Sequence, residues 1–140
     1  MGGMNLAERQ QQLIARYALI EDPQERLAAV VERARKLAPL AEEEKCDSNR
    51  VQGCTSRVWL LGVLEEGRCR FRLDADSTLV KGLAALLCEA CDDADASEIA
   101  ASGMDVLEEL RLVDHLSPTR RHGLAQVWKA IREFAQRQLP

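Results

Sequence analysis

Apolar residues recur along this chain with two different periods, one typical of helices and one typical of strands. Near the start they return every three or four residues, which predicts a helix over residues 5–20. Asp22 can cap a second helix, and Pro23 suits its first position. The helical period continues until Pro39, which should end this helix near Ala38. We therefore expect the first quarter of the chain to form two helices.

The middle of the chain carries the shorter period. Residues 57–64 are rich in Val, Leu and Trp, and residues 68–73 alternate between apolar and arginine side chains, as a half-buried strand does. Glu65-Glu66-Gly67 suits a tight turn between them, so the pattern predicts an antiparallel hairpin. The inward side should carry Cys69, Phe71 and Leu73. A hairpin alone is only marginally stable, so helices or a third strand must cover that face.

The second half of the chain returns to the helical period. Asp76 or Ser77 can cap the first helix of this half, which is apolar nearly all round and should pack in the core. The predicted helices span residues 78–92, 97–102 and 105–112, and a last helix opens at Ser117-Pro118. The order of elements predicts an α+β fold, a small antiparallel sheet covered by helices, in one domain over residues 1–140.

Composition narrows the class of protein. The chain has 140 residues, of which 46% are hydrophobic and 30% charged, as in ordinary soluble domains. A net charge of −4 argues against a general nucleic-acid binder. No apolar run reaches the roughly 18–20 residues of a membrane span, and Met1–Asn5 lacks the features of a signal peptide. We therefore expect a cytoplasmic protein that binds neither membrane nor nucleic acid.

Five cysteines, an odd number without a secretion signal, favour reduced thiols over a disulfide framework. Cys88 and Cys91 lie three positions apart on an apolar helix, which favours packing, with a redox pair as the alternative. Redox pairs of this spacing open a helix, whereas this pair closes one. A metal or iron–sulfur binding module is a further alternative. A structural zinc site needs four ligands, and here these would be Cys46, Cys54, Cys88 and Cys91.

Cys54 stands apart from the other cysteines. Gly53 precedes it, polar turn formers lie upstream and an apolar strand follows, so its thiol should lie on backbone that can bend. Nearby cations lower the pKa of a thiol and make it reactive. Arg50 and Arg57 are close in sequence, and Arg120 lies in the first turn of the last helix. From local sequence alone, a small buried residue at a strand start is an equal alternative.

Two glycines inside predicted helices offer a place for this loop to pack. Gly82 and Gly123 each cost a helix about 1 kcal/mol relative to alanine, and such glycines often permit close approach of another segment. We expect one of them to receive the segment around Cys54. The only histidines, His115 and His122, form no recognisable Cys/His catalytic signature with it.

Three blocks of sequence, taken in order, carry a more specific pattern. They are Asn49-Arg50-Val51-Gln52-Gly53-Cys54 running into Arg57-Val58-Trp59, Asp74 to Leu83, and His115 to Leu124. The second is similar to D-S-D-x-x-I-V-K/R-G-L, with Ala75 in place of the usual serine, and the third to L-[ST]-x-S-R-x-x-G-L. Together they resemble the SufE family, including its paralogue CsdE, which are sulfur-acceptor proteins of cysteine desulfurases.

The resemblance implies a fold akin to that of the IscU scaffold proteins and a defined role for Cys54. This thiol would take sulfane sulfur from the desulfurase as a persulfide and pass it to an iron–sulfur scaffold protein. Pyridoxal phosphate would belong to the partner desulfurase, so we expect no cofactor or metal here. Whether such a carrier is an enzyme depends on definition, and a monomer or a homodimer fits equally. The supporting residues implied are Gln52, Gly53, Arg57, Trp59, Asp74, His115 and Arg120.

Overall fold

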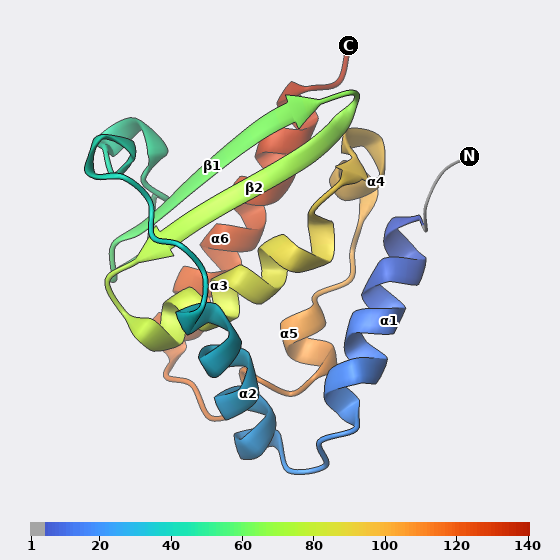
Figure 1. The fold of residues 1–140 in the computed structure, drawn as a ribbon, viewed down its shortest axis with the longest axis vertical. Coiled ribbons are helices and arrows are strands. Elements are labelled where there is room, and N and C mark those ends of the chain that lie inside the picture. The colour runs from blue at the N-terminus through green and yellow to red at the C-terminus, as the bar shows by residue number, and fades with distance from the viewer. Residues whose placement is uncertain (1–4) are drawn as a thin grey trace.

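Six helices and a three-stranded antiparallel sheet make up residues 5–140, the part that this computed structural model describes (Figure 1). Residues 1–4, on which the signal-peptide prediction partly rests, lie outside it. The helices are α1 (Leu6–Ala18), α2 (Pro23–Arg35), α3 (Thr78–Cys91), α4 (Ala96–Ala101), α5 (Val106–Glu109) and α6 (Pro118–Arg137). The strands are β1 (Val58–Glu65), β2 (Arg68–Ala75) and β3 (Ala94–Asp95), and two 3₁₀ turns, Glu42–Glu44 and Asp47–Asn49, lie between α2 and β1.

Side-chain caps explain where the long helices begin. The side chains of Asp22, Ser77 and Ser117 each accept a hydrogen bond from a backbone N–H in the first turn of α2, α3 and α6. Ser77, rather than Asp76, is therefore the cap of α3. The second helix ends at Arg35, three residues before the predicted end, because the chain closes its last turn with a bond from Leu37 N–H to the Ala34 carbonyl.

The predicted hairpin is present, and a third strand extends it. Glu66 and Gly67 both have positive φ, 53° and 80°, the turn geometry that matches the twist of two paired strands. The third strand was not predicted, since a two-residue strand has no measurable period. Asp93, with φ of 64°, turns the chain after α3 so that Ala94 pairs with Cys69.

The core lies between the inner face of the sheet and the helices, with α3 running through its middle (Figure 1). On α3, Leu83 and Leu87 are almost fully buried, and the sheet contributes Cys69, Phe71 and Leu73 as predicted. Gly82 faces α2, where an added Cβ would lie 2.9 Å from the Cα atom of Val31. The packing confirms the predicted α+β class.

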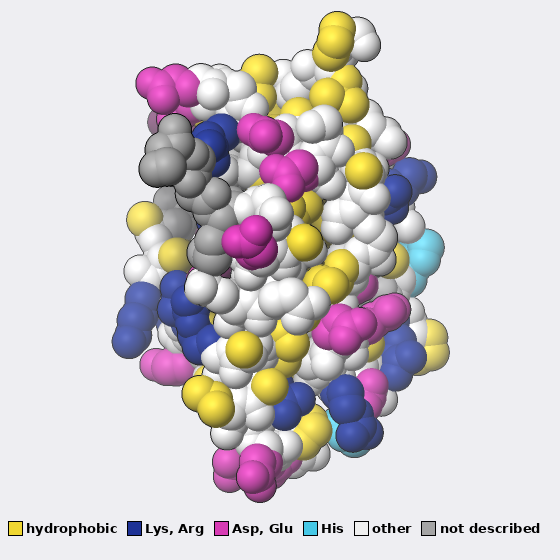
Figure 2. Space-filling model, turned by 90° about the vertical axis from the view of Figure 1, so that its right-hand side faces the viewer, with side chains coloured by type: hydrophobic (Ala, Val, Ile, Leu, Met, Phe, Trp, Pro, Cys, Tyr) yellow, Lys and Arg dark blue, Asp and Glu magenta, His cyan; other side chains and the backbone are white. Residues whose placement is uncertain are grey.

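The arginines on the outer face of the sheet are paired within the molecule. Arg72 forms two hydrogen bonds of 2.8 Å with Glu44, and Arg70 lies within ion-pair distance of Glu65 and Asp93. These arginines therefore form an ordinary charged face of a strand. On the side of the molecule drawn in Figure 2, acidic and basic side chains are likewise interspersed. Within residues 5–140, no helix combines the length and the apolar character that crossing a membrane requires.

Candidate functional site

Cys54 lies on a short loop, residues 52–57, whose two ends are tied together. At its base, Val51 N–H donates to the Val58 carbonyl across 2.8 Å. The later end is held to the start of α3, because Arg57 N–H donates to the Asp76 carboxylate and Asp76 N–H donates to the Arg57 carbonyl. We call residues 52–57 the Cys54 loop.

A glycine turn aims the thiol of this loop at the last helix. Gly53 has φ of 85°, a conformation that favours glycine, and an added Cβ would lie 3.0 Å from Cγ of Gln126. The Sγ of Cys54 donates a hydrogen bond of 3.2 Å to the carbonyl of Gly123 on α6. Of the two glycines proposed to receive this segment, Gly123 does so, whereas Gly82 receives α2.

The thiol is half-buried and faces a hollow of about 240 Å³. The hollow lies where the first turns of α3 and α6 meet the Cys54 loop, so hydroxyl groups, one guanidinium and apolar side chains share its wall. It is lined by Cys54, Thr55, Ser56, Val58, Val80, Ser117, Thr119, Arg120, Gly123 and Leu124. Beyond the thiol there is thus room for additional atoms on sulfur.

The resting thiol is not activated in the way the sequence suggested. Burial raises the pKa of Cys54, and the positive charge of Arg50 opposes that shift only in part. Cys54 is therefore protonated in this conformation, as its hydrogen bond to Gly123 requires. Arg57 is engaged elsewhere, in a 3.2 Å pair with Asp76. Arg120 lines the hollow but is not among the groups that shift this pKa.

The remaining predicted residues surround the Cys54 loop at different distances from the sulfur. Trp59 lies on β1, where it bridges to Arg50 and packs under the Arg57 guanidinium, and it does not line the hollow. Gln52 is exposed on the loop, and its side-chain amide donates to the Arg50 carbonyl across 3.4 Å. His115 is exposed in the segment before α6 and also lies outside the lining of the hollow.

Gln126 is the contact that the sequence did not indicate. Its side chain lies beside the Gly53 turn, one helical turn beyond Gly123 on α6. The only signal in the sequence was that Gly123 and Gln126 are three positions apart on one helix, a spacing that places both on the same face.

The other four cysteines differ from Cys54 in exposure and environment. Burial raises the pKa of Cys69 and Cys88, and that of Cys91 to about 12, so these three are core thiols as predicted. Cys46 is exposed, and a hydrogen bond with Ser48 lowers its pKa. Among residues 5–140, no group of three or more histidine, cysteine or acidic side chains is placed to hold a metal ion. The four-cysteine set considered above is therefore not gathered in this fold.

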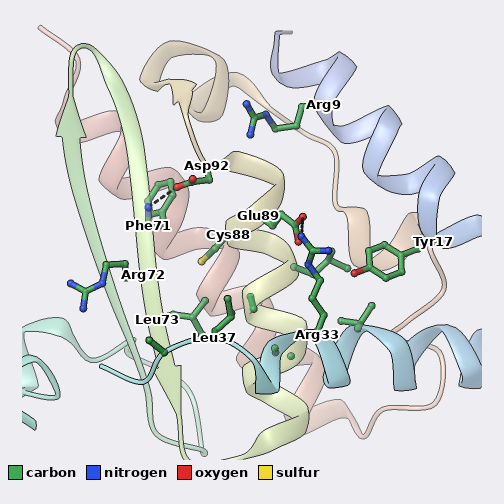
Figure 3. Close-up of a pocket in the computed structure, with 16 residues that line it drawn as sticks. Arg9, Tyr17, Arg33, Leu37, Phe71, Arg72, Leu73, Cys88, Glu89 and Asp92 are labelled. Atoms are coloured by element: carbon green, nitrogen blue, oxygen red, sulfur yellow. Dashed lines mark hydrogen bonds and ion pairs between the residues drawn. The ribbon is translucent and has the colours of Figure 1, made fainter. Parts of the chain in front are cut away.

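A larger cavity, of about 440 Å³, lies on another side of α3 (Figure 3). Its floor is apolar, and Figure 3 shows the Cys88 sulfur between β2 and α3. Most of the charged side chains at its rim already form ion pairs, because Arg33 pairs with Glu89 at 3.0 Å and Arg72 pairs with Glu44. Cys88 is only 5% exposed and its pKa lies well above the ordinary value. The cavity is therefore larger than the Cys54 hollow but offers no available nucleophile.

Comparison with known proteins identifies the family of the chain. The sequence matches the SufE family, described as an Fe–S metabolism associated domain, over residues 11–135. It is 32% identical over 135 residues to an uncharacterised SufE-like protein of Synechocystis, covering 96% of this chain and 85% of that protein. It is 35% identical over 130 residues to an uncharacterised SufE-like protein of Rhizobium etli, with 89% and 88% covered. The chain belongs to the SufE family.

Membership of the SufE family supports a role in sulfur transfer and implies a cysteine desulfurase as partner. The fold has a solved counterpart in the solution structure of a hypothetical protein from Thermus thermophilus. The two superimpose with a TM-score of 0.74 over 92% of this chain and 94% of the other, at 18% identity. That similarity supports the fold assignment alone.

Asp74, which begins the second SufE-like block, is a structural residue in this chain. Its buried carboxylate accepts hydrogen bonds from Leu40 N–H at 3.0 Å and Ala75 N–H at 2.9 Å, and lies 3.3 Å from Lys81 and 3.5 Å from Lys45. Burial by itself raises the pKa of Asp74, but these donors outweigh it and hold the pKa below its usual value. The carboxylate thus ties the segment before the Cys54 loop to the sheet.

The lowered pKa of Asp74 predicts a pH dependence of stability. Its contribution is fully present above the unfolded pKa and is lost as the pH falls through the lower folded pKa. Asp74→Asn is therefore expected to reduce the free energy of unfolding by about 1–2 kcal/mol at neutral pH. The difference should shrink as the pH falls below about 4.

Urea unfolding of both proteins across this pH range measures the effect. Asp47→Asn is the matched control, because Asp47 is exposed and its change should stay within about 0.5 kcal/mol. An Asp74→Asn deficit that is constant with pH would contradict the assignment of this dependence to Asp74.

Proposed function

We propose that this protein is the sulfur acceptor of a cysteine desulfurase, with Cys54 as the carrier thiol. The observation that carries the proposal is the placement of Cys54. Its sulfur lies on a glycine turn, faces a hollow with unfilled space, and is bonded to α6 through one carbonyl. The three buried cysteines lack access, and Cys46 has no comparable shelter. A sulfur carrier needs a turn that lets its thiol reach a donor and a sheltered space that protects the transferred sulfur.

The transfer step is a thiol exchange at sulfur. The Cys54 thiolate attacks the terminal sulfur of the desulfurase cysteine persulfide, the S–S bond in that persulfide breaks, and the desulfurase cysteine leaves as a thiolate. A new S–S bond joins Cys54 to the transferred sulfur, and no external oxidant or reductant is consumed. The proton lost from Cys54 can pass to the departing thiolate. Because the desulfurase cysteine is freed for another cycle, the same step activates the desulfurase.

The resting geometry makes the thiol dormant until the partner binds. Within the hollow, burial keeps Cys54 protonated, and only the thiolate is nucleophilic. Docking on a desulfurase would draw the Cys54 loop out, remove that burial and restore an ordinary thiol pKa. Gln52 and Gly53 would supply the bend, while Arg57 and Trp59 hold the end of the loop that stays in place.

After loading, the loop would return and place the extra sulfur in the hollow. Thr119 and Arg120 in the first turn of α6 line that space, where partial positive charge favours a persulfide anion. There Arg120 would pair with the persulfide rather than with the resting thiol. His115 lies before the same helix, on the surface that a partner would meet.

The proposal includes delivery from Cys54 to an iron–sulfur scaffold protein, and it assigns pyridoxal phosphate to the desulfurase. All five thiols are free in this fold, which suits a reducing compartment such as the cytoplasm.

Intact mass spectrometry tests the carrier role. The protein is incubated with a cysteine desulfurase and L-cysteine and analysed without reductant. We expect wild type to gain the mass of one sulfur atom, and Cys54→Ser to gain none. Cys46→Ser is the matched control, because Cys46 is the most exposed thiol and its loss should leave loading unchanged. A sulfur adduct that survives in Cys54→Ser and disappears in Cys46→Ser would reassign the carrier.

A further inference from the structure

A groove of about 410 Å³ lies between β1 and α6, next to the Cys54 loop. In Figure 1, α6 crosses behind the hairpin that contains β1. Gln52 of the Cys54 loop lines this groove, yet no residue lines both the groove and the hollow that faces the thiol. The loop therefore borders two separate spaces, of which only the hollow faces Cys54.

The groove is positively charged, although the chain as a whole has a net charge of −4. Three cations line it, Arg50, Lys129 and Arg137, against the single carboxylate of Glu133. Within residues 5–140, none of these three cations is recorded in an ion pair. The arginines on the outer face of β2 are neutralised by carboxylates, and those in the groove are not. This excess of positive charge favours an acidic occupant.

The shape of the groove suits an extended segment of chain. Its wall on α6 is a single row of polar side chains three or four positions apart, formed by Gln126, Lys129, Glu133 and Arg137. From the first to the last of these residues the helix rises about 16 Å, which is the length of about five residues in an extended strand. The row begins beside the Cys54 loop and leads away from it.

The opposite wall offers backbone hydrogen bonds to such a segment. The strand order β1-β2-β3 makes β1 an edge strand. Val58 turns its carbonyl away from β2, toward Val51, and alternate residues of a strand share that direction, so the N–H and C=O of Gly62 also point away from β2. Among residues 5–140, no backbone partner outside the β1–β2 ladder is recorded for Gly62. Because Gly62 lines the groove, an extended segment can pair with it there.

Gln126 connects the groove to the Cys54 loop. Its side chain lines the groove, and its Cγ lies 3.0 Å from the position that a Cβ of Gly53 would occupy. One helical turn earlier, the carbonyl of Gly123 accepts the hydrogen bond from Cys54. The same face of α6 therefore holds both the turn and the thiol of the loop. A segment that enters the groove beside Gln126 would push this side chain off the Gly53 turn and loosen the loop.

We propose that an acidic, extended segment of the cysteine desulfurase binds in this groove and releases the Cys54 loop by displacing Gln126. This inference rests on the proposed function, because it names the surface through which the desulfurase acts. Lys129 and Arg137 bind the acidic side chains, and Gly62 pairs with the backbone of the segment. Gln126 is a positioning residue, since it restrains the loop and does not contact the transferred sulfur. The thiol then leaves its hollow only when a sulfur donor is present.

Isothermal titration of the desulfurase into the Cys54→Ser protein, without L-cysteine, measures docking in the absence of sulfur loading. In this background we expect Lys129→Glu to weaken binding about tenfold at low salt. The difference should shrink as NaCl screens the charges. Lys36→Glu is the matched control, because Lys36 is also exposed and lies outside the groove. Its binding should stay within about twofold of the parent protein.

Gln126→Ala tests the coupling between the groove and the loop through two measurements. In a Cys46→Ser background without desulfurase, the alkylation rate of Cys54 by iodoacetamide should rise about threefold, because the loop opens more often. In the Cys54→Ser background, affinity for the desulfurase should rise by a similar factor, since a released loop is already competent to bind. Removing a mere docking contact would weaken binding instead. Gln136→Ala, on the same helix but outside the groove, should change neither quantity.

Equal affinities of Lys129→Glu and Lys36→Glu for the desulfurase would overturn the docking site. A Gln126→Ala protein that binds the desulfurase more weakly, or whose Cys54 reacts no faster, would overturn the coupling. If Lys129→Glu accepted sulfur normally but delivered it poorly to a scaffold protein, the groove would belong to the scaffold and the proposal would fall. The proposed function fails by a different result, a wild type that gains no sulfur on Cys54.

Discussion

A Gly123→Val substitution is expected to drive Cys54 out of its hollow and to raise its alkylation rate at neutral pH by about tenfold or more. An added Cβ at Gly123 lies 3.6 Å from Sγ and 4.0 Å from Cβ of Cys54, which is ordinary contact distance. The two further methyl groups of valine would occupy the space that the sulfur now fills, and a β-branched side chain in a helix has little freedom to turn aside. Once expelled, the thiol loses the burial that raises its pKa.

Iodoacetamide alkylation followed by mass spectrometry measures this rate. The reaction is best run in a Cys46→Ser background, because Cys46 is an exposed thiol whose pKa is lowered. Gly123→Ala is the matched control, since its single methyl group fits beside the sulfur. Alanine also stabilises the helix by about 1 kcal/mol relative to glycine. Equal alkylation rates in Gly123→Val and Gly123→Ala would show that α6 does not gate this thiol.

Replacing Arg26 by methionine is expected to reduce the free energy of unfolding by about 3 kcal/mol. The Arg26 side chain is 9% exposed and has no carboxylate partner recorded within residues 5–140. Instead it donates to backbone carbonyls: Nε and Nη2 to Ile20 at 3.0 and 2.7 Å, Nε to Tyr17 at 3.2 Å, and Nη1 to Leu110 at 2.7 Å. These carbonyls lie in the last turn of α1 or just beyond the ends of α1 and α5, where helices leave acceptors unpaired.

Urea unfolding monitored by circular dichroism gives the change in free energy. Methionine keeps much of the apolar stem but offers no donor, so the loss reports on the hydrogen bonds. Arg33→Met is the matched control, because Arg33 makes a largely exposed ion pair with Glu89 and should cost less than about 1 kcal/mol. Similar losses in the two variants would show that Arg26 does not join α1, α2 and α5 as we infer.

The sequence predicted well those features that local chemistry determines. Ser117-Pro118 marks the start of α6, and Gly67 suits the positive φ of a tight hairpin turn. The position of Cys54 after Gly53 indicated a bent loop for the same reason. Each of these predictions depends on a few neighbouring residues, so the rest of the fold was not needed to make it.

What the sequence could not predict depends on contacts between distant segments. Cys54 has cations nearby in sequence, yet burial against α6 dominates its pKa. Arg26 lies one helical turn before Val30 on α2, and only the carbonyls at the ends of α1 and α5 allow a charged side chain to be buried there. The strand Ala94–Asp95 exists because Cys69 and Arg68 lie beside it. In each case the deciding partner is far away in the chain.

The tied ends of the Cys54 loop also set a limit on the depth of the partner's active site. The sulfur-bearing residue lies three positions after Val51, where the backbone is held to Val58. Three fully extended residues span about 10 Å, so the loop cannot carry the Cα atom of Cys54 further from that base unless the base itself opens. A desulfurase with a shallow cysteine can be served by the loop alone. One whose cysteine lies at the bottom of a longer channel would have to pull β1 apart from Val51.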